Sequence, residues 1–131
     1  PEFSHAVTGP DLLAFQELVR RVPVSESVLR YAVNLVRASR PSANGDSPDF
    51  VKKWIAYGAS VRAAQYLVLG SKAKALTQGR YHVSFDDIKS LAHPVLRHRI
   101  LTNFHAESEG RTTGEIIDRL LEHVPVPTSG M

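Results

Sequence analysis

Apolar residues recur at helical spacing in five segments of this chain, and each segment has recognisable start and stop signals. The first segment begins at Thr8-Gly9-Pro10, ends at Pro23, and carries Leu12, Phe15, Leu18, Val19 and Val22. The second follows Ser25, a residue type that caps helices, and carries Val28, Leu29, Ala32, Val33 and Val36. Both patterns predict amphipathic helices that face a core.

The third segment predicts the longest helix, from about Val61 to Gln78, with Ser60 as N-cap and Gly79 as a left-handed stop. Its predicted buried residues are Ala63, Tyr66, Leu69, Ala73 and Leu76. A fourth helix should follow Ser84, with Asp87 as its capping-box acid, and break at His93-Pro94; its inward residues are Phe85, Ile88, Leu91 and Ala92. A fifth, capped by Thr112 or Thr113 and ended by Val124-Pro125-Val126-Pro127, carries Ile116, Ile117, Leu120 and Leu121.

The connecting segments predict little regular structure. Alternation over Tyr81 to Val83 predicts a short strand, paired with a second one from Arg99 to Asn103. The stretch from Phe50 to Tyr57 fits either a helical turn or an extended chain, with Trp54 as a core anchor. Residues 39–48 read as an exposed loop suited to contacts. The predicted fold class is therefore all-α: a bundle of about five helices with a small two-stranded hairpin.

The length and composition of the chain indicate one domain and exclude several classes of protein. The 131 residues are 43% hydrophobic and include no cysteine, which excludes disulfides and zinc-thiolate sites and favours the cytoplasm. We expect no membrane span, because no apolar run approaches the roughly 20 residues required. The net charge of +3 is spread over short basic pairs, so no nucleic-acid surface is expected. We expect residues 1–3 to be a cloning remnant, 4–127 the domain and 128–131 a tail.

Catalytic motifs are missing from the sequence. It has no Gly-x-x-x-x-Gly-Lys-Ser/Thr phosphate loop and no strand ending in a magnesium-binding acidic pair, so it is not a complete nucleotide hydrolase. The six histidines lack metal-ligand spacing, and no metal site is predicted. No serine lies in a nucleophile elbow, and helix capping explains Asp86-Asp87 better than acid–base catalysis does.

The most informative motif is Gly-Ala-Ser-Val-Arg-Ala at residues 58–63, which places an arginine in the first turn of the long helix. A helix start offers free N–H groups and a positive dipole end to an anion, and an arginine adds a forked charged donor. Gly58, Ala59, Ser60 and Arg62 are therefore candidate phosphate-binding residues. The alternative is an ordinary capped helix whose Arg62 is solvated or paired with a carboxylate.

At this motif the chain resembles the C-terminal lid of MoxR-type AAA+ ATPases. Seven elements match in order along nearly the whole chain. The first three are Leu-Val-Arg-Arg-Val-Pro-Val (18–24), Leu-Val-Arg-Ala-Ser-Arg-Pro (35–41) and Gly-Ala-Ser-Val-Arg-Ala (58–63). The other four are Ala-Leu-Thr-Gln-Gly-Arg (75–80), Val-Ser-Phe-Asp-Asp-Ile (83–88), Val-Leu-Arg-His-Arg-Ile (95–100) and Ala-Glu-Ser-Glu-Gly (106–110). One departure is Val61, where the family usually has proline; proline is merely favourable there, so its loss should cost little.

The resemblance implies that Arg62 is the second-sensor arginine, a catalytic residue that reaches the terminal phosphate of ATP. ATP and Mg²⁺ would be held mainly by a core domain that this sequence does not include. It further implies a homo-hexamer with core–lid contacts, chaperone-like maturation or metal-cofactor insertion, and clients with von Willebrand A domains. The fragment alone would be inactive.

Three questions stay open at this point. Arg97-His98-Arg99 either begins the second strand, with Arg99 paired to Glu107 or Glu109, or makes a contact between domains or subunits. A different class, a small basic DNA-binding module like a histone fold, fits the helix–strand–helix unit around Lys72 to Leu91. A third function is a protein–protein adaptor that binds through residues 39–48.

Overall fold

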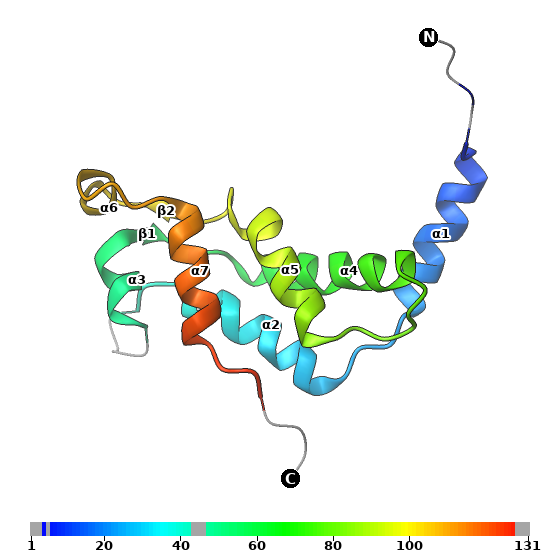
Figure 1. The fold of residues 1–131 in the computed structure, drawn as a ribbon, viewed down its shortest axis with the longest axis horizontal. Helices are drawn as coiled ribbons and strands as arrows, with labels where there is room; N and C mark the ends of the chain where they lie inside the picture. The colour runs from blue at the N-terminus through cyan, green and yellow to red at the C-terminus, as the bar shows by residue number, and fades with distance from the viewer. Residues whose placement is uncertain (1–3, 5, 43–46, 128–131) are drawn as a thin grey trace.

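The computed structural model describes residues 4, 6–42 and 47–127 and is mainly helical (Figure 1). In chain order its elements are α1 (Gly9–Arg21), α2 (Glu26–Ala38), α3 (Asp49–Trp54), β1 (Ile55–Tyr57), α4 (Val61–Thr77), α5 (Phe85–Leu96), β2 (Leu101–Thr102), α6 (Phe104–Ser108) and α7 (Thr113–His123). The five long helices are those that the apolar pattern predicts, and α3 and α6 are short additions. The predicted fold class, all-α with a small two-stranded sheet, is confirmed.

Side-chain caps set most of the helix starts where the sequence predicts them. Thr8 and Asp11 form a capping box at α1, and Ser84 and Asp87 form another at α5. The Ser25 hydroxyl caps α2, and Thr112 rather than Thr113 caps α7. Gly79 has φ +73°, the left-handed conformation predicted after the long helix.

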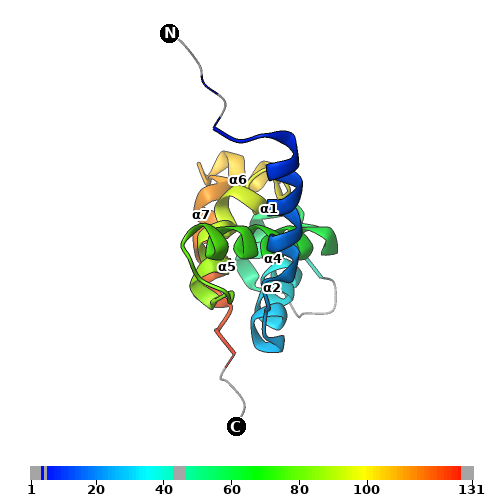
Figure 2. The same cartoon turned by 90° about the vertical axis from the view of Figure 1, so that its right-hand side faces the viewer.

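The core lies where α2, α4, α5 and α7 meet, with α4 packed against both α2 and α5 (Figures 1 and 2). Tyr31 and Leu35 of α2, which the predicted stripe omitted, are fully buried, whereas Leu29 and Val33 are exposed. From α4 the buried residues are Ala63, Ala64, Leu67, Ser71 and Ala75. The predicted Tyr66 and Leu69 are instead 40% and 46% exposed. Apolar residues lie on several sides of α4, so their spacing alone does not predict which side of the helix is buried.

Helix α1 extends away from the bundle and touches it mainly through α4 (Figure 1). The prediction that its apolar stripe faces the core is wrong for three of its residues. Leu12, Phe15 and Leu18 are exposed, and only Val19 of this helix is buried. The apolar stripe is present on α1, but among the described residues only α4 packs extensively against this helix, so most of the stripe stays exposed.

The predicted pairing of the two strands is also wrong. Residues 81–83 form no strand, and β1 pairs with β2 in an antiparallel sheet, with Ile55 opposite Thr102. The segment from Phe50 to Tyr57 is helix first and strand afterwards, so both alternatives for it hold in part. Val83 is buried beside the Ser84 cap whereas Tyr81 is 67% exposed, so the two apolar residues of the alternation do not face the same environment.

The prediction that His93-Pro94 breaks the fourth helix is wrong, because α5 continues through Pro94 to Leu96. A proline inside a helix costs about 3 kcal/mol. Full burial of Leu96, one turn after the buried Ala92, offsets most of that cost, since burying a leucine contributes about 1.5–3 kcal/mol. The Arg97 N–H donates to the His93 carbonyl at 3.0 Å and closes the last turn.

Asp87 ties the end of α4 to the start of α5. Its carboxylate accepts hydrogen bonds from Arg80 Nη1 at 2.8 Å and Nη2 at 2.7 Å, and from the Ser84 N–H at 2.9 Å. The Arg80 guanidinium, with a smaller contribution from Ser84, lowers the pKa of Asp87 from 3.8 to about 2 against the opposing effect of burial. The ionised form of this buried side chain therefore stabilises the fold.

Acid should weaken the fold through Asp87. Because its pKa is lower in the folded state, its contribution is complete above about pH 4 and is lost as the pH falls toward about 2. We expect Asp87→Asn to remove about 2 kcal/mol of unfolding free energy at pH 7 and to flatten this acid dependence. Thermal unfolding between pH 7 and 2 measures both, with the exposed Asp86→Asn as matched control. Parallel pH curves for Asp87→Asn and the unmodified chain would contradict the assignment.

Candidate functional site

Arg62 is the second residue of α4, and its side chain is exposed. The guanidinium of Arg62 has no hydrogen-bond or ion-pair partner among the described residues. Ser60 is the N-cap residue by backbone geometry, but its hydroxyl makes no capping bond, and the first turn of α4 has no acidic residue. Of the two ordinary roles that the sequence allows for Arg62, pairing with a carboxylate does not occur among the described residues. This helix start therefore presents unneutralised positive charge.

The segment that leads into α4 is held tightly against the end of α2. A Cβ atom on Gly58 would lie 2.3 Å from the Ser39 carbonyl oxygen and 2.6 Å from Arg40 Cα, so only glycine allows this approach. The fully buried Ser39 donates its hydroxyl to the Val36 carbonyl at 2.6 Å and accepts the Ala59 N–H at 3.1 Å. We call the contact of residues 39–40 with 58–59 the α2–α4 junction. It fixes the start of α4 on the body of the domain.

Gly58 and Ala59 thus serve as backbone spacers, and Ser60 and Arg62 are the members of the candidate set that expose polar side chains. Sequence reasoning missed the role of Ser39. The sequence assigns Ser39-Arg40-Pro41 both to a matching element and to an exposed loop, and neither assignment indicates that Ser39 is buried.

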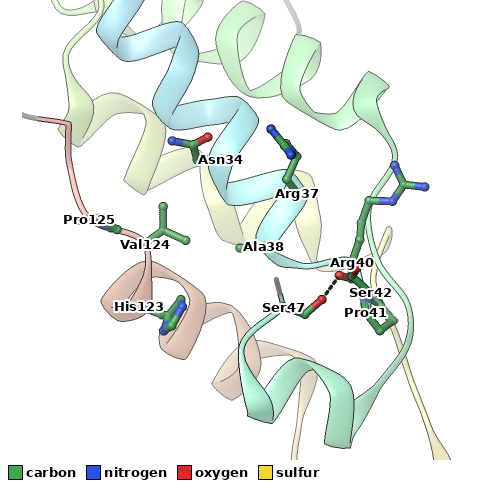
Figure 3. A pocket seen from close by; sticks show the side chains of 10 residues that line it. All are labelled: Asn34, Arg37, Ala38, Arg40, Pro41, Ser42, Ser47, His123, Val124 and Pro125. Atoms are coloured by element: carbon green, nitrogen blue, oxygen red, sulfur yellow. Dashed lines mark hydrogen bonds between the residues drawn. The ribbon is translucent and has the colours of Figure 1, made fainter. Parts of the chain in front are cut away.

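A cleft of about 570 Å³ opens beside the junction, between the end of α2 and the chain that follows α7 (Figure 3). Its lining comprises Asn34, Arg37, Ala38, Arg40, Pro41, Ser42, Ser47, His123, Val124 and Pro125. Two arginines and no carboxylate are among these residues. Positions 43–46 of the predicted contact loop lie outside the described residues, and Ser39 and Ser47 within it are buried rather than exposed.

Trp54 is the core anchor that the sequence predicts, with only 4% of its surface exposed. Its Nε1–H donates to Glu109 Oε2 at 2.9 Å, and this bond, supported by Lys53, lowers the pKa of Glu109. Arg111 and Arg119 lie 5.0 and 4.7 Å from the centre of the indole ring. The ring is therefore held by side chains of its own domain, which favours a structural role.

The first interpretation of Arg97-His98-Arg99 is wrong. Arg99 precedes β2, and its Nη1 donates to the Val95 carbonyl at 2.8 Å while the guanidinium lies 4.6 Å from the centre of the Tyr66 ring. The Glu109 carboxylate is occupied by Trp54 and Lys53, so it is not a partner of Arg99. A contact between domains or subunits remains a prediction for Arg97 and His98, which are exposed.

No group of three histidine, cysteine, aspartate or glutamate side chains within 4, 6–42 and 47–127 could hold a metal ion. In the same residues, none of the helices is both long enough and apolar enough to cross a membrane.

Comparison with known proteins relates this chain to a family. A family model described as the AAA lid domain matches residues 47–120, which include the whole of α4. The curated protein Chaperone MoxR1 of Mycobacterium tuberculosis is 31% identical over 97% of this chain, and uncharacterized protein YeaC of Bacillus subtilis is 28% identical over 92%. These matches cover 33% and 35% of the relatives, so the chain spans about a third of their length.

A solved structure supports the same relationship. The crystal structure of a "putative ATPase" from Cytophaga hutchinsonii superposes with a TM-score of 0.83 at 37% identity. The match covers 91% of this chain and 36% of that protein. The likeness therefore extends to the arrangement of nearly all the helices described above.

Proposed function

Because this chain belongs to the AAA lid domain family, we propose that it serves a MoxR-type AAA+ ATPase as the lid that supplies a sensor arginine, Arg62, to bound ATP. The observation that carries the proposal is the exposed guanidinium of Arg62 in the first turn of α4, which has no partner among the described residues. The terminal phosphate of ATP carries negative charge, which would neutralise the positive charge at the start of α4. Arginine is suited to it because its planar fork can donate two hydrogen bonds to one phosphate.

The described residues fit a phosphate but not the metal that accompanies ATP. Arg62 and the N–H groups at the start of α4 are donors, whereas no group of carboxylates is placed to bind Mg²⁺. We assign the base, the ribose and Mg²⁺ to the core domain of the complete ATPase. Bound Mg²⁺ would neutralise the charge on the phosphates there, and this chain contributes a positive side chain from the opposite side of the nucleotide.

The exposed stripe of α1 supplies a surface for that core domain. Leu12, Phe15 and Leu18 would be covered if the remaining two thirds of the protein packed against this helix. We expect the α1 amides to exchange hydrogen at least tenfold more slowly in the full-length ATPase than in this chain alone, because packing suppresses local opening. Amides of α7 provide the internal control. Equal α1 protection in both proteins would exclude this helix from the core contact.

The isolated chain should not bind ATP tightly. A charge-assisted hydrogen bond contributes about 1.5–3 kcal/mol, whereas micromolar affinity requires about 8 kcal/mol. We expect calorimetric titration of ATP into the chain to show no binding at micromolar concentration, and the full-length ATPase to bind under the same conditions. Micromolar affinity of the isolated chain would show that the nucleotide site had been assigned to the wrong domain.

The role of the complete protein follows the relative named Chaperone MoxR1. We propose a cytoplasmic homo-hexamer that couples ATP hydrolysis to chaperone-like maturation, including metal-cofactor insertion, of partners such as proteins with von Willebrand A domains. Light scattering of the full-length ATPase with ATP tests the ring. The histone-like alternative loses its basis, because the family match includes the unit around Lys72 to Leu91 on which it rested.

A further inference from the structure

We propose that Arg40 is a second arginine of the nucleotide site and contacts the phosphates of the same ATP from the end of α2. This inference rests on the proposed function of Arg62. It concerns a residue that follows the C-terminal end of α2 and reaches the site only because the chain folds back on itself. The ligand class is a nucleoside triphosphate, recognised through its phosphate oxygens.

The α2–α4 junction brings Arg40 to the start of α4. The Cβ position of Gly58 lies 2.6 Å from Arg40 Cα, so the two backbones touch four residues before Arg62. The hydrogen bond from the Ala59 N–H to the buried Ser39 hydroxyl holds this contact in place. Figure 3 shows the Arg40 side chain directed from the end of α2 toward the segment that enters α4.

No carboxylate among the described residues neutralises the charge of Arg40. Its side chain is exposed and has no hydrogen-bond or ion-pair partner among the described residues. Arg37, one turn earlier on the same cleft, is likewise exposed and unpaired, and no carboxylate is among the described lining residues. Elsewhere on α2, Arg30 pairs with Glu26 at 3.1 Å. Among the arginines of α2 and its C-terminal end, Arg37 and Arg40 are therefore the two without an ion pair among the described residues.

This arrangement suits an anion with more than one negative group. Like charges held at one end of a domain repel one another, and a polyphosphate relieves that repulsion while it accepts a forked hydrogen bond from each guanidinium. Because the junction joins the two backbones directly, Arg40 and Arg62 move together as parts of one rigid body. A lid that closes on ATP would bring both to the phosphates at once.

The test uses the full-length ATPase with the variants Arg40→Ala and Arg40→Lys. We expect Arg40→Ala to weaken binding of a hydrolysis-resistant ATP analogue with Mg²⁺ at least tenfold, the loss typical of one charge-assisted contact. Arg40→Lys should recover part of that loss, because it keeps the charge but not the fork. Affinity for adenosine, which has no phosphate, should not change. The matched control is Arg30→Ala, which removes the same charge from within α2, about 12 Å along the helix axis from its last residue, Ala38.

Unchanged affinity of Arg40→Ala for the ATP analogue would overturn the proposal, as would an equal loss for adenosine or for the Arg30→Ala control. The parallel variant Arg62→Ala separates this inference from the function on which it rests. If Arg62→Ala abolishes turnover while Arg40→Ala binds nucleotide normally, only the role of Arg40 fails. If Arg62→Ala has no effect, the proposed function itself fails.

Discussion

Replacing Arg62 with alanine in the full-length ATPase is expected to lower kcat for ATP hydrolysis by roughly 10³-fold or more. The reason is electrostatic: a guanidinium placed beside the terminal phosphate stabilises the charge that develops as the bond breaks. The stability of the domain should change by less than about 0.5 kcal/mol, because the side chain is exposed and has no partner among the described residues. Steady-state kinetics and thermal unfolding, measured on the same preparations, give both quantities.

The Arg30→Ala variant serves as control here too, since Arg30 is an exposed arginine whose ion pair lies within its own helix. It should leave both kcat and the melting temperature near their original values. Normal turnover of Arg62→Ala together with a large loss of stability would make Arg62 a structural residue and contradict the account.

Replacing Gly58 with alanine is expected to have the largest effect on stability. The added Cβ would lie 2.3 Å from the Ser39 carbonyl oxygen and 2.6 Å from Arg40 Cα, and both of these are backbone atoms. Relief therefore requires the two segments to separate, which strains or breaks the hydrogen bond from the Ala59 N–H to Ser39 Oγ. Overpacking of this kind costs about 1–3 kcal/mol, or about 4–12 °C in melting temperature for a domain of this size.

The matched control is Gly114→Ala, because a Cβ there meets nothing closer than Thr112 Oγ1 at 3.8 Å. Gly114 lies in the first turn of α7, where alanine should be neutral or stabilise by up to about 1 kcal/mol. Thermal unfolding of the 131-residue chain compares the two variants directly. A Gly58→Ala chain as stable as Gly114→Ala would contradict the tight junction.

Local signals in the sequence were sufficient for the helix starts. Thr8, Ser25, Ser84 and Thr112 cap their helices because each hydroxyl needs only the N–H groups of the next few residues. Strand pairing and helix faces depend instead on distant partners. The strand at Ile55 pairs with Thr102, and the buried face of α4 is chosen by the helices around it rather than by its own pattern.

The candidate site likewise has one part that local sequence predicts and one part that depends on distant contacts. The motif at residues 58–63 located Arg62 at the start of a helix, because a glycine, a capping residue type and an apolar register are all local. The contact of Gly58 with Ser39, and with it the position of Arg40, joins residues about 20 positions apart and has no periodic signature. Only the folded chain brings those residues together.

The most direct test of the central claim is the coupling between Arg62 and the terminal phosphate. Calorimetry on the full-length ATPase and its Arg62→Ala variant, with a hydrolysis-resistant ATP analogue and with ADP, forms a double-mutant cycle in which the ligand supplies the second change. The account predicts that the variant loses about 1.5–3 kcal/mol of binding free energy for the analogue and almost none for ADP. Equal losses for the two ligands, or no loss for either, would show that Arg62 does not contact the terminal phosphate.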